Sequence, residues 1–206
     1  MSKKKKYIPL IIFFTFSVYC GLIIGQSLDE EYHLMQGKIT LDYLLSFGQL
    51  DIDSVRPSSE INYGQYYSTI YWSLLYFISE IFPSKYQTEI NHLVNLIFSF
   101  STIIGIGKVS KELFNKKVGK IVFLILLFYP IFFGHMSINS KDTILAFGHV
   151  WMVYLILRYL KKQGLNDKTK KYVISIGLLT ALTTGIQLTF LGSQIPIFLF
   201  IIIEIF

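Results

Sequence analysis

The feature that most constrains this chain is the arrangement of its apolar residues in blocks of roughly twenty. A helix rises about 1.5 Å per residue, so a block of that length matches the ~30 Å hydrocarbon layer of a bilayer. The composition agrees, because 52% of the residues are hydrophobic and only 16% are charged, whereas a soluble domain carries about 25% charge. These features predict an all-α, polytopic membrane helix bundle that forms a single membrane domain over residues 1–206.

The first apolar block, residues 7–25, follows four consecutive lysines and contains no charged residue. We expect it to be a retained first transmembrane helix. A cleaved signal peptide is the alternative, since basic residues before an apolar run are typical of one. The run is longer than the apolar core of about 7–15 residues in most signal peptides, and no clear small-residue cleavage site closes it.

Five further spans are predicted at residues 88–107, 118–136, 143–160 and 172–192 and from residue 195 onward, which gives about six in all. Residues 67–82 form a shorter segment that is rich in tyrosine and tryptophan. Because such rings favour the headgroup layer, this segment is predicted to be an interfacial helix rather than a span. It would lie on the outer surface, within a first outer loop at residues 26–87.

The lysines and arginines predict the orientation. The amino-terminal tail holds four of them, residues 108–120 hold five and residues 158–171 hold six, together fifteen of the nineteen in the chain. The positive-inside rule places these stretches, and the amino terminus, in the cytoplasm. If residues 67–82 formed a span, every later loop would change sides and the bias would vanish. The net charge of +6 is therefore attributed to topology and anionic lipid, and no nucleic-acid partner is expected.

Acidic residues show the opposite distribution, since ten of the thirteen fall on or near the predicted outer side. The segment that follows the first helix carries Asp29, Glu30, Glu31 and His33. Carboxylates and an imidazole held there by a helix end are suited to act as general bases or metal ligands. The simpler alternative is that acidic residues after a span are only solvated.

A second polar segment, residues 135–142 (HMSINSKD), lies between the third and fourth predicted spans. Asp142 directly precedes the fourth span, where a carboxylate can cap free N–H groups and interact with the helix dipole. That capping role is the simpler alternative here. Because both outer segments are fixed to helix ends and both carry carboxylate and histidine, they could converge on one active site at the membrane surface.

With these motifs in this order, the chain resembles the amino-terminal half of the GT-C membrane glycosyltransferases. The relatives concerned are the dolichyl-phosphate-mannose protein mannosyltransferases and the bacterial polyprenyl-phosphate sugar transferases. The resemblance rests on Asp29-Glu30 with His33 in the first outer loop, on Tyr63-Gly64 before the aromatic helix, and on Asn139-Ser140-Lys141-Asp142 after Pro130. It extends from the first helix to about Gly192.

The resemblance implies a glycosyltransferase that moves a sugar from a polyprenyl-phosphate donor to an acceptor on the non-cytoplasmic face. Asp29 would be the catalytic base with Glu30 beside it, while Lys141 would stabilise the departing phosphate and Asp142 would orient acceptor or metal. Substrate binding would involve His33, Tyr63, Asn139, Lys141 and Asp142. The implied location is a bacterial inner (plasma) membrane with a periplasmic active face. A divalent metal cofactor and the identity of the acceptor are left open.

The chain departs from the family in length, because full members have about eleven or more spans. We therefore expect it to be the amino-terminal part of such a protein, with activity of this part alone in doubt. A transporter subunit and a noncatalytic membrane scaffold are the alternative functions. A transporter would place ionisable residues in the middle of its spans, whereas here the first four predicted spans are nearly free of them.

Overall fold

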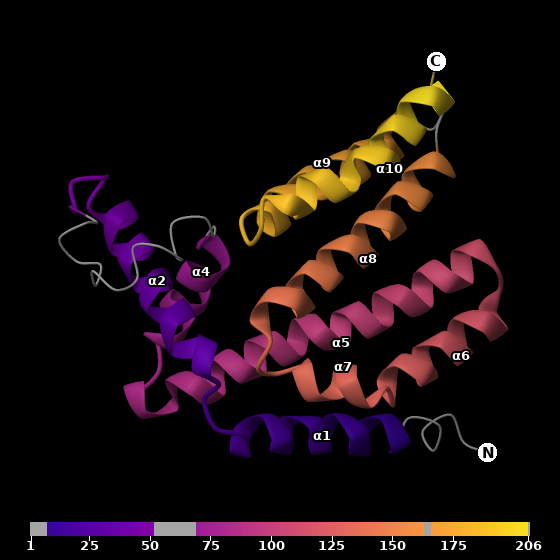
Figure 1. Ribbon diagram of the computed structural model, residues 1–206. Coiled ribbons are helices and arrows are strands. Elements are labelled where there is room, and N and C mark those ends of the chain that lie inside the picture. The colour runs from indigo at the N-terminus through magenta and orange to yellow at the C-terminus, as the bar shows by residue number, and fades with distance from the viewer. Residues whose placement is uncertain (1–7, 52–68, 163–165, 206) are drawn as a thin grey trace.

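The computed structural model describes residues 8–51, 69–162 and 166–205, and all regular structure in these ranges is helical. The predicted all-α class is therefore confirmed for these residues (Figure 1). In chain order the elements are α1 (Ile8–Ile23), α2 (Leu28–Leu45), α4 (Ile70–Ser79), the short 3-10 helix η4 (Ser84–Tyr86), α5 (Gln87–Leu113), α6 (Lys116–Leu127), α7 (Pro130–His135), α8 (Ser140–Leu160), α9 (Asn166–Thr184) and α10 (Thr189–Ile205).

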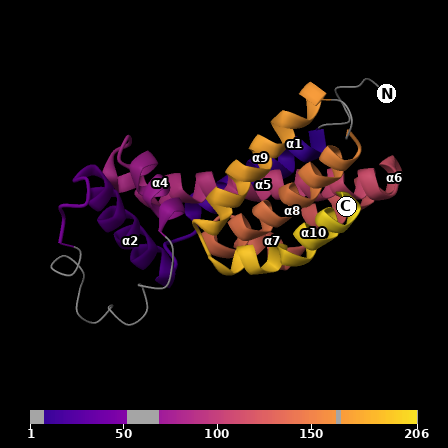
Figure 2. The same ribbon diagram turned by 90° about the horizontal axis from the view of Figure 1, so that it is seen from above.

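Helix α5 is the centre of the bundle, since it packs against α1, α4, α6 and α8. One apolar cluster joins α4, α5 and α8 around Trp72 and Ile144, and a second joins α1, α5, α6 and α7 around Ile103. A third cluster joins α8 to α9 and α10 around Met152. Helices α2 and α4 pair with each other at one end of α5, away from α6 (Figures 1 and 2).

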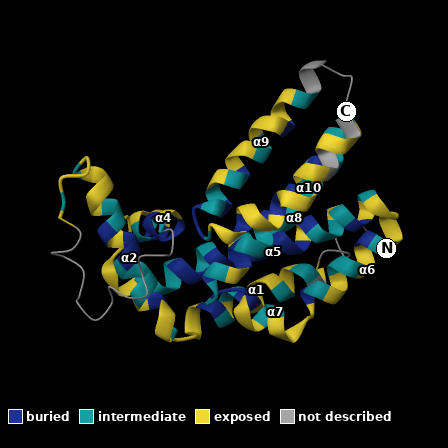
Figure 3. Ribbon diagram, turned by 45° about the horizontal axis from the view of Figure 1, so that its top comes forward, coloured by how far each residue is buried: buried dark blue, intermediate teal, exposed yellow. Residues whose placement is uncertain are grey.

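Two helices among the described residues are long and apolar enough to cross a bilayer, namely α5, extended by η4, and α8. They contain the predicted spans at residues 88–107 and 143–160. The bent pair α1 and α2 would add a third span if it is counted as one. The predicted count of about six spans is therefore not confirmed. Many residues of α1, α6, α9 and α10 are exposed apolar side chains, which suits contact with lipid (Figure 3).

The predicted span at residues 118–136 is interrupted. Helix α6 ends at Leu127, and α7 begins at Pro130, whose ring nitrogen has no hydrogen to donate to a continuing helix. The twelve residues of α6 rise only about 18 Å. The predicted span at residues 172–192 also contains a break, because α9 ends at Thr184 and α10 begins at Thr189. The span predicted from residue 195 begins inside α10.

The aromatic segment predicted to be interfacial forms α4, whose ten residues rise about 15 Å and cannot cross the hydrocarbon layer. Its Tyr71 and Trp72 side chains are buried against the neighbouring helices. Helix α2 packs closely on α4 because Gly37 has no side chain, since a Cβ there would overlap the Trp72 carbonyl oxygen. The placement of α4 at the membrane surface stays a prediction.

Basic residues gather at the end of the bundle opposite α2 and α4. The carboxylate of Glu112, near the end of α5, lies 3.0 Å from Arg158 Nη1 and 2.7 Å from Lys161 Nζ. These ion pairs join the ends of α5 and α8. The turn from α5 to α6, with its further lysines, lies at the same end (Figure 1). The positive-inside rule would place this end of the bundle in the cytoplasm, and that orientation stays a prediction.

Candidate functional site

A polar cavity of about 320 Å³ lies between the start of α2 and the turn that leads from α7 into α8. The chain bends by 81° between α1 and α2, and Ser27, which lies at this bend, lines the cavity. The cavity is lined by Ser27, Asp29, His33, His135, Ile138, Asn139, Ser140, Lys141 and Asp142. The two polar segments that the sequence suggested could converge do line one cavity, which unites five of the seven predicted site residues.

The two remaining predicted residues are Glu30 and Tyr63. Tyr63 lies outside the described residues. Glu30 does not line this cavity, and only 7% of its surface is exposed. One of its carboxylate oxygens accepts a hydrogen bond from the Ser27 backbone N–H at 2.6 Å, which helps to fix the first turn of α2. Its burial and this hydrogen bond favour a positioning role for Glu30. The catalytic role expected from the sequence stays a prediction.

The second Glu30 oxygen lies 2.8 Å from Nε2 of His92, a fully buried residue of α5. The other ring nitrogen of His92, Nδ1, lies 2.7 Å from the Gly21 carbonyl oxygen. A carbonyl oxygen only accepts, so Nδ1 carries a hydrogen, and a further hydrogen must lie between Nε2 and the carboxylate. The pair is therefore an imidazolium with a carboxylate, or a neutral imidazole with a protonated acid. In either form it ties the end of α1, the start of α2 and α5 together.

His33 lies on α2, one turn after Asp29, and is held by stacking. Its ring is parallel to the Trp72 indole within 10°, with 3.8 Å between ring centroids. Trp72 in turn donates its indole N–H to Ser140 Oγ at 3.2 Å. Burial lowers the pKa of His33 from 6.5 to about 4, with Lys141 adding to that effect and Asp29 and Glu30 opposing it. His33 is therefore neutral at pH 7 and can donate one hydrogen bond and accept another.

The opposite wall of the cavity is the first turn of α8. Asn139 is its N-cap, and its side-chain oxygen accepts from the Asp142 backbone N–H at 3.0 Å. The Asn139 side-chain nitrogen donates to an Asp142 carboxylate oxygen at 3.0 Å and lies 3.2 Å from His135 Nδ1. Asp142 therefore interacts with the helix end, as the simpler alternative required, while it also faces the cavity.

Polar side chains of α5 form hydrogen bonds with the backbone of the turn between α7 and α8. Asn95 donates to the Ser137 carbonyl oxygen at 2.8 Å and accepts from the Tyr71 hydroxyl at 2.5 Å. One turn further on, Ser99 donates to the Met136 carbonyl oxygen at 2.9 Å. Buried hydrogen bonds of this kind fix the backbone of the turn, because leaving either partner unpaired is costly. The turn is thus attached to the same helix that holds Glu30.

Sequence reasoning missed the link between His92 and Glu30 and the stacking of Trp72 on His33. A usable signal for the first was present, since Asn91, His92, Asn95, Ser99 and Thr102 recur at helical spacing within an apolar segment. Such a polar stripe on a membrane helix indicates contacts with other helices. The particular partners could not be read, because Glu30 lies sixty-two positions away in the chain.

Metal use stays open. Asp29, Asp142, His33 and His135 bring oxygen and nitrogen donors to the cavity wall. Within the described ranges, however, no three His, Cys, Asp or Glu side chains are close enough together to hold an ion by themselves. A metal at this site would therefore need donors from substrate, from water or from other parts of the protein.

Apolar helices long enough to cross a bilayer, with a cavity at their ends that is lined by carboxylates, histidines and a lysine, are the features of an integral membrane protein with a polar binding site. The chain belongs to the dolichyl-phosphate-mannose-protein mannosyltransferase family, whose model matches residues 70–205. It is thus a glycosyltransferase of the mannosyltransferase type, and the GT-C resemblance drawn from the sequence is confirmed.

The matched residues run from α4 to α10 and include the Asn139–Asp142 side of the cavity, whereas Asp29 and His33 precede them. No curated protein and no solved structure matches the chain. The family implies a lipid-linked sugar donor and a membrane location.

Proposed function

We propose that this protein transfers a sugar from a polyprenyl-phosphate donor to an acceptor hydroxyl, with Asp29 as the general base. The observation that carries the proposal is the shared cavity. Asp29 lies on one of its walls and Lys141 and Asp142 on the other, so acid–base chemistry and phosphate binding would take place in one space. Asp29 is exposed to that space, unlike the neighbouring Glu30.

The reaction needs a base at one point only. As the acceptor oxygen attacks the anomeric carbon, its proton must leave, and the Asp29 carboxylate would take it. The bond between the anomeric carbon and the phosphate oxygen breaks at the same time, and the lipid phosphate departs with its electron pair. A phosphate is already a good leaving group, so cationic stabilisation matters more there than a strong general acid.

Lys141 is the cation of the cavity wall and would neutralise the departing phosphate. His33 would serve as a neutral hydrogen-bonding group, since its low pKa keeps it uncharged at pH 7. Asp142, held by Asn139, would orient the acceptor. A role for Tyr63 in substrate binding remains part of the proposal, on the resemblance alone.

The cavity would face the non-cytoplasmic side of a bacterial plasma membrane. Support for this comes from the basic residues near Glu112, Arg158 and Lys161, which lie at the opposite end of the bundle and which the positive-inside rule assigns to the cytoplasm. Cysteine substitutions at positions 29 and 142 should then react with a membrane-impermeant maleimide added outside intact cells.

The decisive experiment uses proteoliposomes that contain the chain and a radiolabelled polyprenyl-phosphate-mannose, and it measures transfer of the mannose to water, which serves as the acceptor hydroxyl and releases free mannose and the lipid phosphate. Asp29→Asn should lower transfer at least about 100-fold, the lower range for loss of a general base, while donor binding is retained. The matched control is Glu31→Gln, which removes a charge from the same helical turn but not from the cavity wall. It should retain transfer within about twofold, as expected of a solvated group outside the site.

Two results would refute the proposal. Transfer by Asp29→Asn equal to that of the parent would remove Asp29 from the base role. A parent chain that does not bind the polyprenyl-phosphate sugar would reject the donor class.

A further inference from the structure

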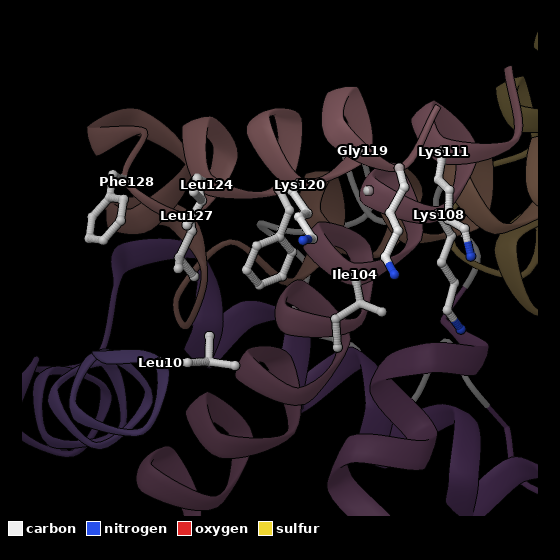
Figure 4. A pocket seen from close by; sticks show the side chains of 12 residues that line it. Leu10, Ile104, Lys108, Lys111, Gly119, Lys120, Leu124, Leu127 and Phe128 are labelled. Carbon is white, nitrogen blue, oxygen red and sulfur yellow. The ribbon is translucent and has the colours of Figure 1, made fainter. Parts of the chain in front are cut away.

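A second cavity, of about 560 Å³, lies at the basic end of the bundle, between α1, α5 and α6. Its walls are largely apolar and include Leu10, Ile104, Leu124, Leu127 and Phe128. Four lysines also line it: Lys108, Lys111, Lys116 and Lys120. Figure 4 shows that Leu124, Leu127 and Phe128 lie toward one end of the groove and Lys108 and Lys111 toward the other. We call this cavity the lysine groove.

A close helix crossing brings the four lysines together. Gly107 of α5 and Gly119 of α6 face each other, and a Cβ on Gly119 would lie 2.6 Å from the Gly107 carbonyl oxygen. Small residues at a crossing let two helix backbones approach in this way. Each glycine lies within one turn of two of the lysines along its own helix, so charges from both helices converge beside the crossing.

The four lysines of the groove form no ion pair among the described residues. Glu112, the carboxylate nearest to them along α5, is paired with Arg158 and Lys161 instead. All four side chains are exposed, and Lys108 lies 4.7 Å from the centre of the Trp151 ring. Like charges grouped at one place repel one another, and a bound anion relieves that repulsion.

The apolar part of the groove is suited to contact with a hydrocarbon group and not with an ion. Leu124 is 50% exposed and Phe128 is 61% exposed, and both continue from the lysines along α6 toward the middle of the bundle. A free phosphate ion would neutralise the lysines but leave these side chains uncovered. A ligand that covers both parts has an anionic head and a hydrocarbon tail in line, which is the shape of a membrane phospholipid.

We propose that the lysine groove binds an anionic phospholipid from the leaflet at the basic end, with its headgroup phosphate among the four lysines and an acyl chain against Leu124 and Phe128. The site lies at the opposite end of the bundle from the polar cavity, and it does not depend on the sugar-transfer reaction. Its lipid would hold α1, α5 and α6 together from the membrane side.

The test uses the full chain in phosphatidylcholine vesicles that contain a small fraction of phosphatidylglycerol with a photoreactive diazirine in the acyl chain. Illumination should label peptides of α6 that contain Leu124 and Phe128, and unlabelled phosphatidylglycerol should compete with the label. Lys116→Gln with Lys120→Gln should weaken that competition roughly tenfold or more, since each lysine near an anionic lipid contributes on the order of 1 kcal/mol.

The matched control is Lys117→Gln with Lys170→Gln, which removes the same charge from the same end of the bundle but from residues that do not line the groove. Competition in this control should change less than about twofold, because salt screens charges that lie outside the groove from the bound headgroup. An equal loss in both double variants would show only diffuse surface attraction and would overturn the proposal. Equal labelling by a phosphatidylcholine probe, or a groove protected by a second copy of the chain, would overturn it as well.

Discussion

Replacement of His92 by leucine tests the main structural link of the site. The imidazole is fully buried and bridges Gly21 at the end of α1 to Glu30 at the start of α2. Leucine has a similar volume, so His92→Leu removes the hydrogen bonds and any charge without leaving a large cavity. Glu30 then remains buried with its Ser27 contact but without its partner on α5.

The expected loss of stability is large. Removal of one partner from a buried ion pair costs about 3–5 kcal/mol, because the remaining charge stays desolvated. For a chain of this size, 1 kcal/mol corresponds to about 2–4 °C in Tm, so His92→Leu should lower the Tm by about 6–20 °C. Adding Glu30→Gln to His92→Leu should recover part of the loss, since a neutral amide is less costly to bury than an unpaired carboxylate.

Thermal unfolding in detergent micelles, followed by far-UV circular dichroism, measures these changes for both single variants and the double variant. His135→Leu is the control, since His135 is an exposed histidine whose loss should change stability by less than about 0.5–1 kcal/mol. Unfolding of His92→Leu at the same temperature as the parent would contradict a stabilising link between His92 and Glu30. Effects of the two single variants that add within about 0.5 kcal/mol would contradict it as well, because contacting residues should be coupled.

Three further predictions concern other parts of the molecule. The pKa of His33 falls from 6.5 to about 4 on folding, so the unfolded chain binds more protons than the folded chain between these pH values. The free energy of unfolding should therefore decrease as the pH drops from about 6.5 to 4, by on the order of 2 kcal/mol after allowance for partial solvent screening. Urea unfolding across that range measures the decrease, which should be absent in His33→Gln. Gly119→Ala should destabilise by about 1–3 kcal/mol because its Cβ would meet the Gly107 carbonyl oxygen, whereas Gly177→Ala, with no atom nearby, should be neutral or slightly stabilising in the same assay. Glu112→Gln should weaken the contacts to Arg158 and Lys161 by about 1 kcal/mol or less in total, with the difference from the parent shrinking at high salt, because these charges are partly exposed.

Hydropathy predicted the helical class and the two longest apolar helices well. Residues 88–107 and 143–160 lie inside α5 and α8 because long uninterrupted apolar runs have one stable solution in lipid, a helix that satisfies its own backbone. The same measure did not detect the break at Pro130 or the turn around Gly185. At Pro130 the flanking residues remain apolar, so a change of backbone direction leaves the hydropathy almost unchanged. Around Gly185 the flanking Thr184, Gln187 and Thr189 are uncharged and lie between apolar residues, so the average over a span-length window stays apolar.

The candidate site was only partly predictable for a related reason. Asp29, His33 and Asp142 were found because they follow or precede apolar runs, and helix ends fix where such residues lie. The interactions that orient them come from long-range contacts, such as Trp72 with His33 and Asn95 with Ser137. A hydrogen bond between residues forty or more positions apart depends on the packing of whole helices, which the local pattern does not contain.

The link from Gly21 through His92 to Glu30 has a consequence for substrate choice. His92 contacts both the end of α1 and the start of α2, so it fixes the position of Asp29 relative to the end of α1. If Asp29 is the base, as proposed, its distance from the lipid phosphate is then set by the protein and not by the substrate. Isoprenoid tail length should therefore matter little, whereas a donor with a second phosphate between lipid and sugar would displace the anomeric carbon from the carboxylate and abolish turnover.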